Sequence, residues 1–273
     1  MQIPPASPAR PSRCHAVIPS AGSGSRLPGD APKQYRRLLG ESVVQHTVRA
    51  FLQTPRIASV SVVVQEGDVW VADALQPDPR LHLVPRGGAT RAHSVLGGLE
   101  ALLEAGAAHD DWALVHDAAR CCITPELIDR LIDACLPDDV GGLLALPLPD
   151  TLKAADSAGR VARTEPREGR WLAQTPQMFR IGVLREALQA AIEANAPPPP
   201  GRPKAGAAPS GGSERAAGAW GQQSPPTDEA GAMERQGARP LLVPGASWNF
   251  KITYSPDLEL AQALLAARAG VST

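Results

Sequence analysis

Short apolar stretches recur along the chain, and each is followed by a segment rich in glycine, serine or charged residues. Five of them have the length of strands: His15–Pro19, Ile57–Val64, Leu81–Pro85, Trp112–His116 and Gly141–Leu148. Short apolar runs rich in β-branched side chains are typical of strands that are covered on both faces. We therefore predict a strand at each of these positions.

Helical segments fill the intervals between the predicted strands. We predict helices over Val43–Gln53, Thr90–Ala105, Pro125–Leu136 and Pro256–Arg268, with Thr90 in the place of a helix cap. The last helix is expected to bury an apolar face formed by Leu258, Leu260, Ala261 and Leu264. Strands that alternate with helices predict a three-layer α/β fold with a mostly parallel sheet. In such sheets ligands bind beyond the carboxyl ends of the strands.

Proline and glycine are concentrated in two segments. Residues 1–13 hold four prolines, and Asn195–Pro226 holds eight prolines and six glycines with almost no branched aliphatic side chains. Such segments bury too little apolar surface to offset the loss of chain entropy on folding. We expect a disordered tail over 1–13, followed by a single domain over 14–273 that contains a disordered insertion at about 195–226.

Charge and cysteine content exclude several classes of protein. The 273 residues carry 27 Lys plus Arg and 28 Asp plus Glu, a net charge of −1, so a general affinity for nucleic acid or for a membrane surface is not expected. No apolar run approaches the ~18 residues of a membrane span, and the N-terminal residues lack the apolar stretch of a secretory signal. The four cysteines show no Cys-x-x-Cys spacing, which indicates free thiols and a cytoplasmic location.

Residues suited to binding a phosphate follow the first predicted strand. Small residues in Ser20–Gly24 would let backbone N–H groups approach a phosphate, and Arg26 and Lys33 add two cations. The segment matches neither G-x-G-x-x-G nor the Walker A pattern, and a flexible surface loop would have the same composition. Its position after a strand favours the functional interpretation.

Two further strand ends carry candidate ligand-binding residues. After the third strand, Gly87 and Gly88 permit a tight turn, and Thr90 or Ser94 could cap the helix or contact a base. After the fourth, Asp117 could hold Mg²⁺ on bound phosphates, because hard cations prefer carboxylate oxygens. A plain turn and a helix-capping aspartate remain the alternatives for these two segments.

Polar residues flank a turn at Asp156–Arg160, which predicts an extended β-arm over about 150–171 carrying Thr151 and Arg167. An arm this polar is normally covered by a partner subunit, and a solvated hairpin with ordinary surface charges is the alternative. Thr227–Ala230 reads as a capped helix start with acidic residues in its first turn. Asn249–Thr253 reads as a short strand whose Lys251 either lies at an edge or faces an anion, since an unpaired buried cation is costly.

In order along the chain, these segments resemble one family, the 2-C-methyl-D-erythritol 4-phosphate cytidylyltransferases of isoprenoid precursor synthesis. The matching stretches are AVIPSAGSGSRL, PKQY, GGATRAHSVLGGL, LVHDAAR, DTLK, TPQMF, TDEA and NFKIT. The resemblance implies a nucleotide-diphospho-sugar transferase (Rossmann-like) fold with a projecting β-arm. It also implies transfer of CMP from CTP to 2-C-methyl-D-erythritol 4-phosphate, with Mg²⁺ required, pyrophosphate released and a homodimer formed through the arms.

Matching motif positions imply a role for each candidate residue. Arg26 and Lys33 would stabilise the transition state, and Arg167 and Lys251 would hold the substrate phosphate for attack. Asp117 would hold the metal ion. The residues expected to line the CTP site are Ser20, Ala21, Gly22, Gly88 and Ser94, and those expected on the methylerythritol side are Thr151, Arg167 and Thr227.

The chain departs from the family pattern at Cys121, where a proline is usual, and at Trp248, where a polar residue is common. Three other functions stay open: a cytidylyltransferase for another polyol phosphate such as ribitol 5-phosphate, a nucleotide-sugar pyrophosphorylase, and a non-catalytic nucleotide-binding protein. The order of the DTLK, TPQ and TDEA segments disfavours the pyrophosphorylase. The presence of all five charged candidates, Arg26, Lys33, Asp117, Arg167 and Lys251, disfavours a decayed site.

Overall fold

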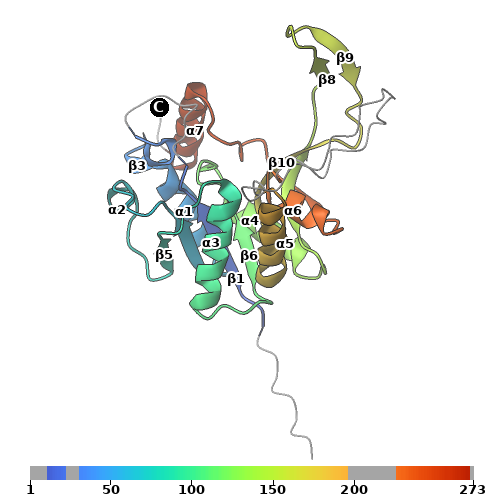
Figure 1. Ribbon diagram of the computed structural model, residues 1–273. Helices are drawn as coiled ribbons and strands as arrows, with labels where there is room; N and C mark the ends of the chain where they lie inside the picture. The colour runs from blue at the N-terminus through green and yellow to red at the C-terminus, as the bar shows by residue number, and fades with distance from the viewer. Residues whose placement is uncertain (1–10, 23–30, 196–225, 271–273) are drawn as a thin grey trace, which may run out of the picture.

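A seven-stranded sheet forms the centre of the molecule in the computed structural model, which describes residues 11–22, 31–195 and 226–270 (Figure 1). The strand order is β11-β7-β10-β6-β1-β4-β5. The seven strands are β1 (Cys14–Pro19), β4 (Ile57–Val63), β5 (Leu81–Val84), β6 (Trp112–Val115), β7 (Gly142–Pro147), β10 (Trp171–Arg180) and β11 (Leu241–Pro244). All pairings are parallel except those of β10 with β6 and β7, which confirms the predicted mostly parallel sheet.

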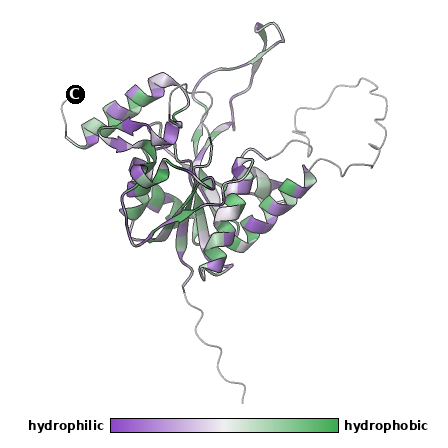
Figure 2. Cartoon of the chain, turned by 60° about the vertical axis from the view of Figure 1, so that its left-hand side comes forward, coloured by the Kyte–Doolittle hydropathy of each residue, from purple (hydrophilic) through white to green (hydrophobic). Residues whose placement is uncertain are grey.

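Helices cover both faces of this sheet. α1 (Val43–Leu52) and α4 (Pro125–Cys135) pack on one face, where Phe51 and Ile128 belong to one buried apolar cluster. α3 (Arg91–Glu104), α5 (Ile181–Ala194) and α6 (Glu229–Arg235) pack on the other, around Leu99 and Leu184. Hydrophobic residues, coloured green, are concentrated on the central strands and recur along the helices that cover them (Figure 2). The predicted three layers are confirmed.

Apart from Asn249–Thr253, the predicted strands and helices lie within about two residues of their expected bounds. Thr90 is the N-cap of α3, and its hydroxyl accepts a hydrogen bond from the backbone N–H of His93. Ser42 caps α1 in the same way through the N–H of Gln45. The sequence pattern did not reveal α5 or β11. The smaller elements are η1 (Lys33–Tyr35), β2 (Arg37–Leu38), β3 (Glu41–Ser42) and α2 (Val71–Ala74).

An antiparallel hairpin projects from the body of the protein (Figure 1). It consists of β8 (Leu152–Ala155) and β9 (Val161–Glu165), and its side chains are mostly exposed. The Asp156 carboxylate closes the connecting turn by accepting hydrogen bonds from the N–H groups of Ala158 and Arg160. This hairpin lies where the sequence predicts the arm.

Two sequence-based expectations were wrong. Asn249–Thr253 is an extended segment rather than a strand, because its backbone groups bind Ala119, Lys33 and Arg120 instead of a neighbouring strand. In α7 (Ser255–Arg268), Leu260 is 53% exposed, whereas Ala261 is buried. The short segment 249–253 is held by charged side chains, which an apolar-periodicity argument does not detect.

The expected tail and insertion fall mainly on residues outside the described ranges, namely 1–10 and 196–225. Arg26 lies outside them as well. Within residues 11–22, 31–195 and 226–270, no helix combines the length and the apolar character needed to cross a bilayer.

Candidate active site

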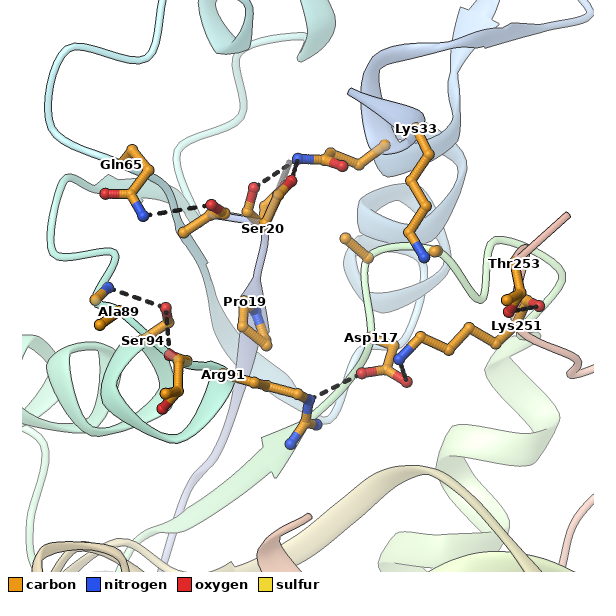
Figure 3. Close-up of a pocket in the computed structure, with 17 residues that line it drawn as sticks. Pro19, Ser20, Lys33, Gln65, Ala89, Arg91, Ser94, Asp117, Lys251 and Thr253 are labelled. Atoms are coloured by element: carbon orange, nitrogen blue, oxygen red, sulfur yellow. Dashed lines mark hydrogen bonds and ion pairs between the residues drawn. The ribbon is translucent and has the colours of Figure 1, made fainter. Parts of the chain in front are cut away.

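A cavity of about 670 Å³ opens at the carboxyl ends of β1, β4, β5 and β6 (Figure 3). The loops that follow these four strands supply most of its lining, and η1, the first turn of α3 and the segment before α7 supply the rest. The sequence-predicted residues that line it are Ser20, Ala21, Gly22, Lys33, Gly88, Ser94, Asp117 and Lys251. The structure therefore brings eight of the twelve candidates into one cavity.

Close packing fixes the loops at this edge of the sheet. The N–H of Ser20 donates to Val63 O at 2.7 Å, so the loop after β1 continues the sheet by one residue. A Cβ atom on Gly87 would lie 2.4 Å from the Ala21 side chain, and no rearrangement of a flexible side chain could relieve that clash. Gly87 therefore lets the loop after β5 lie directly against the loop after β1.

Ser94 lies at the start of α3 and holds the loop after β5. Its hydroxyl accepts from Gly88 N at 3.1 Å and donates to Thr90 O at 3.2 Å. Ser94 is 3% exposed. Its hydroxyl is thus engaged with the main chain while the side chain lines the cavity.

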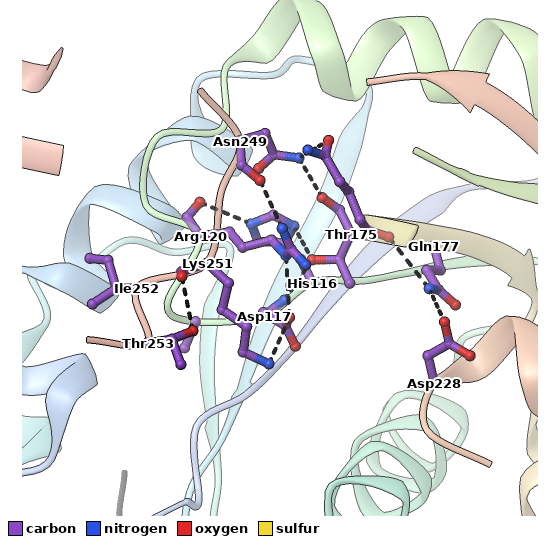
Figure 4. Close-up of polar contacts among 12 residues, drawn as sticks. His116, Asp117, Arg120, Thr175, Gln177, Asp228, Asn249, Lys251, Ile252 and Thr253 are labelled. Carbon is purple, nitrogen blue, oxygen red and sulfur yellow. Dashed lines mark hydrogen bonds and ion pairs between the residues drawn. The ribbon is translucent and has the colours of Figure 1, made fainter. Parts of the chain in front are cut away.

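Three cations surround the Asp117 carboxylate, which follows β6. Arg91 Nε lies 3.0 Å from Oδ1, while Lys251 Nζ and Arg120 Nε lie 3.0 and 3.3 Å from Oδ2. Arg120 also donates from Nη1 to Asn249 O at 2.8 Å (Figure 4). Asp117 is the one acidic side chain lining the cavity among the described residues.

These charges control the ionisation of Asp117. Burial alone would raise the pKa of its carboxyl group, but the positive charges of Arg91, Lys251 and Arg120 outweigh that effect and hold the pKa far below its usual value. Asp117 is therefore ionised at neutral pH. It gives a fixed negative charge around which the cations are arranged.

His116 supports Asp117 from below the cavity. It is fully buried against Phe51, and burial lowers its pKa to about 3. Nε2 lies 3.2 Å from Arg120 O, an acceptor only, so Nε2 carries the proton and Nδ1 accepts from the Thr175 hydroxyl at 3.0 Å. Thr175 Oγ1 in turn accepts from Asp117 N. His116 is thus a neutral packing residue.

The 249–253 segment positions both lysines of the cavity. Asn249, which is fully buried, donates from Nδ2 to Thr175 O at 2.8 Å. Two residues later Lys251 reaches Asp117, which satisfies the expectation that this lysine faces an anion. Lys33 Nζ donates to Ile252 O at 3.0 Å. The two ammonium groups consequently approach the same part of the cavity from different elements.

Arg91 links the cavity to α6. Its Nη1 and Nη2 atoms lie 2.5 and 3.0 Å from the two carboxylate oxygens of Glu229, which is fully buried. Burial by itself would lower the pKa of Arg91, but Glu229 and Asp117 more than compensate and the pKa stays above its usual value. Asp228, not Thr227, is the N-cap of α6, and its Oδ2 accepts from Gln177 Nε2.

Three candidates lie away from this cavity within the chain. Thr151 is exposed at the base of the hairpin, and Thr227 lines a separate apolar cavity between α3, α5 and α6. Arg167 lines a shallow cavity at the arm base and donates a hydrogen bond to Pro149 O. Gln34, Arg91 and Arg120 are not among the sequence-predicted residues, although they lie inside the motifs PKQY, GGATRAHS and HDAAR.

The described residues could supply only a small share of the ligands of a magnesium ion. Among the described residues, no group of three or more His, Cys, Asp or Glu side chains is placed to hold a metal. Mg²⁺ commonly binds through one or two carboxylates together with substrate phosphates and waters. Asp117 offers one such carboxylate at the edge of the cavity.

Comparison with known proteins gives one family. The model of the IspD family, 2-C-methyl-D-erythritol 4-phosphate cytidylyltransferase, matches residues 14–197 and 215–267. The chain is 49% identical to the enzyme of that name from Laribacter hongkongensis, over 93% of this chain and 96% of the relative. It is 50% identical to the bifunctional enzyme IspD/IspF of Albidiferax ferrireducens, where it spans 94% of itself but 54% of the relative.

Solved structures agree with these matches. A crystal structure of 4-diphosphocytidyl-2C-methyl-D-erythritol synthase superposes with a TM-score of 0.74 at 34% identity, covering 93% of this chain and 99% of the other. The 2-C-methyl-D-erythritol 4-phosphate cytidylyltransferase of Francisella tularensis superposes with a TM-score of 0.69 at 28% identity, covering 93% and 100%. From its sequence and its fold together, the chain belongs to the 2-C-methyl-D-erythritol 4-phosphate cytidylyltransferase family.

Proposed function

We propose that the chain transfers CMP from CTP to 2-C-methyl-D-erythritol 4-phosphate, giving 4-diphosphocytidyl-2-C-methyl-D-erythritol and pyrophosphate. The observation that carries the proposal is the cavity at the strand ends. The cavity is lined by Lys33, Arg91 and Lys251, by the glycine- and serine-containing loop after β1, and by a single carboxylate, Asp117. This charge pattern suits two polyanionic substrates.

The chemistry requires positioning and charge more than proton transfer. An oxygen of the 4-phosphate attacks the α-phosphorus of CTP, and the bond from that phosphorus to the bridging oxygen of the β-phosphate breaks as pyrophosphate leaves. The attacking phosphate is already ionised, so no general base is needed. The proposed step therefore does not use His116, which is neutral and fully buried, as a base.

Each cation has a place in this step. Lys33, together with Arg26, stabilises the charge that builds on the oxygens around the α-phosphorus. Lys251 and Arg167 hold the attacking phosphate. In the free protein the Lys251 ammonium group forms an ion pair with Asp117. A bound substrate phosphate would be a second anionic partner for Lys251. Asp117 with the triphosphate would hold Mg²⁺, which would supply further neutralisation of the phosphate charge.

The position of Arg167 supports a homodimer. This arginine lies at the base of the projecting hairpin, outside the cavity that holds Lys33 and Lys251 of its own chain. Ordering an exposed polar arm costs conformational entropy, and contacts with a partner can offset that cost. We propose that two copies pair through their arms and that Arg167 completes the site of the partner, in a cytoplasmic enzyme.

Pyrophosphate release from CTP in the presence of Mg²⁺ tests the proposal. The wild-type protein is assayed with 2-C-methyl-D-erythritol 4-phosphate, erythritol 4-phosphate and ribitol 5-phosphate, with a Lys251→Met variant as control. We expect kcat/KM to be highest for the methylerythritol substrate by at least about tenfold, the effect of one missing methyl group or of a chain that is one carbon too long for the pocket. A preference for ribitol 5-phosphate would assign the chain to another polyol phosphate. Release independent of any polyol phosphate would reject the transfer reaction.

A further inference from the structure

Two glutamine side chains hold three consecutive carbonyl groups of the loop after β1. Gln34 Nε2 donates to Ser20 O at 2.8 Å and to Gly22 O at 2.9 Å. Gln65 Nε2 donates to Ala21 O at 3.3 Å (Figure 3). We propose that Gln34, assisted by Gln65, is a positioning residue that prepares this loop for the triphosphate of the nucleotide.

The shape of the peptide unit determines how the two glutamines orient the loop. A trans peptide is planar, so its N–H points opposite to its C=O. When Gln34 binds Ser20 O, the N–H of Ala21 turns away from Gln34; when Gln65 binds Ala21 O, the N–H of Gly22 turns away from Gln65. Carbonyl oxygens carry partial negative charge and would repel a phosphate. The two amides bind those oxygens and thereby fix the orientation of the peptide planes, so that these carbonyl groups cannot turn toward the anion.

Only an amide side chain suits the position of Gln34. One amide nitrogen carries two N–H donors, and both are used here, on carbonyls two residues apart. Gln34 is 4% exposed, so water cannot replace these contacts freely. A glutamate of the same shape has no donor when ionised and would face two carbonyl oxygens.

Gln34 also joins two parts of the site. It lies in η1 directly after Lys33, whose ammonium group is held on Ile252 O. Gln65 follows β4, so the loop is fastened to the helical turn on one side and to the sheet on the other. A change in Gln34 should therefore disturb nucleotide binding first, and the polyol side of the cavity much less.

This inference rests on the proposed use of CTP, so the test measures CTP binding directly. Titration calorimetry with CTP and Mg²⁺ is applied to wild type, Gln34→Met, Gln34→Glu and Gln65→Met. Gln45→Met is the matched control, because Gln45 is also a buried glutamine bound to the main chain, through Gln76 N, but lies outside the cavity. Steady-state kinetics give the KM for each substrate, and Tm is recorded for every variant.

We expect the Kd for CTP to rise roughly 10- to 30-fold in both Gln34 variants, on the scale of two lost hydrogen bonds, and about three- to fivefold in Gln65→Met, on the scale of one. The KM for the polyol phosphate should change less than about twofold, and Gln45→Met should bind CTP as wild type does. If Gln34→Met or Gln34→Glu fails to fold, the Kd of Gln65→Met for CTP still tests the inference, because Gln65 is exposed and its replacement leaves the core intact.

Two results would overturn the inference: CTP affinity within about twofold of wild type in every folded Gln34 and Gln65 variant, or an equal rise in the KM of both substrates. If the wild-type protein bound no CTP, the proposed function itself would fail. The positioning role is then decided by hydrogen exchange at Ala21 and Gly22, where faster exchange in Gln34→Met or Gln65→Met supports it and unchanged exchange rejects it.

Discussion

At the scale of single residues, Asp117 organises the site by charge. Three cations converge on one buried carboxylate, so at least two of them keep an anionic partner even when Lys251 turns to a substrate. A buried charge left without any partner is costly, but Asp117 keeps Arg91 and Arg120 when Lys251 leaves it. The cavity can therefore present Lys251 to a phosphate without losing the arrangement of Arg91 and Arg120.

Replacing either lysine of the cavity should remove activity and spare the fold. We predict that Lys33→Met and Lys251→Met each lower kcat/KM by roughly 10²-fold or more, the scale observed when one preorganised charge-stabilising group is lost. Tm should stay close to wild type because Asp117 retains Arg91 and Arg120. Arg56→Met, which removes a cation paired with Asp133 on the surface, is the control. Near-normal turnover in either lysine variant would reject its assignment.

His116 should make stability depend on pH in mildly acidic solution. Its pKa falls from 6.5 to about 3 on burial, so between these values the unfolded chain binds a proton that the folded chain does not. Stability is therefore lost as the pH falls below about 6.5. Asp117, whose pKa is also lowered, begins to contribute only below its ordinary value of 3.8.

We predict that wild type loses about 1 kcal/mol more unfolding free energy between pH 7.5 and pH 5.5 than His116→Gln does. Glutamine keeps a donor for Arg120 O but does not titrate. Urea unfolding at the two pH values measures the difference. Parallel losses in both proteins would show that His116 is not held neutral.

At the scale of elements, the sequence predicted the strands and helices that have a clear pattern of apolar residues. The strands that became β1, β4, β5, β6 and β7 are short buried runs, and Thr90 fixed the start of α3. The 249–253 segment was misassigned because its conformation comes from Arg120, Lys33 and Ala119, far away in the sequence. Arg91 and Gln34 were missed for the same reason: their partners are Glu229, Ser20 and Gly22.

The proline-rich segment between α5 and α6 should be replaceable. Asn195 and Pro226 line the same cavity between α3, α5 and α6, so a short linker can join them. We predict that a Gly/Ser linker in place of 196–225 leaves kcat/KM within about threefold and Tm within a few degrees, because low-aliphatic, Pro- and Gly-rich sequence adds little buried surface. A drop in Tm of ten degrees or more would show that the segment packs on the domain.

At the scale of the whole molecule, the proposed dimer divides each site between two chains. Mixing an inactive Arg167→Ala protein with an inactive Lys33→Met protein should then restore activity, since a mixed dimer has one site with both changes and one with neither. Random pairing makes half of the dimers mixed, so about a quarter of wild-type sites should recover. Confirmed subunit exchange without recovery would mean that Arg167 serves its own chain.

The central claim is that a phosphate oxygen of the polyol substrate attacks the α-phosphorus of CTP in the cavity that holds Lys33 and Lys251. The most direct measurement uses 2-C-methyl-D-erythritol 4-phosphate labelled with ¹⁸O in its phosphate, incubated with CTP, Mg²⁺ and the protein, with both products weighed by mass spectrometry. We predict that all of the label appears in 4-diphosphocytidyl-2-C-methyl-D-erythritol and none in pyrophosphate. Label in pyrophosphate, or free CMP as the only nucleotide product, would contradict the account.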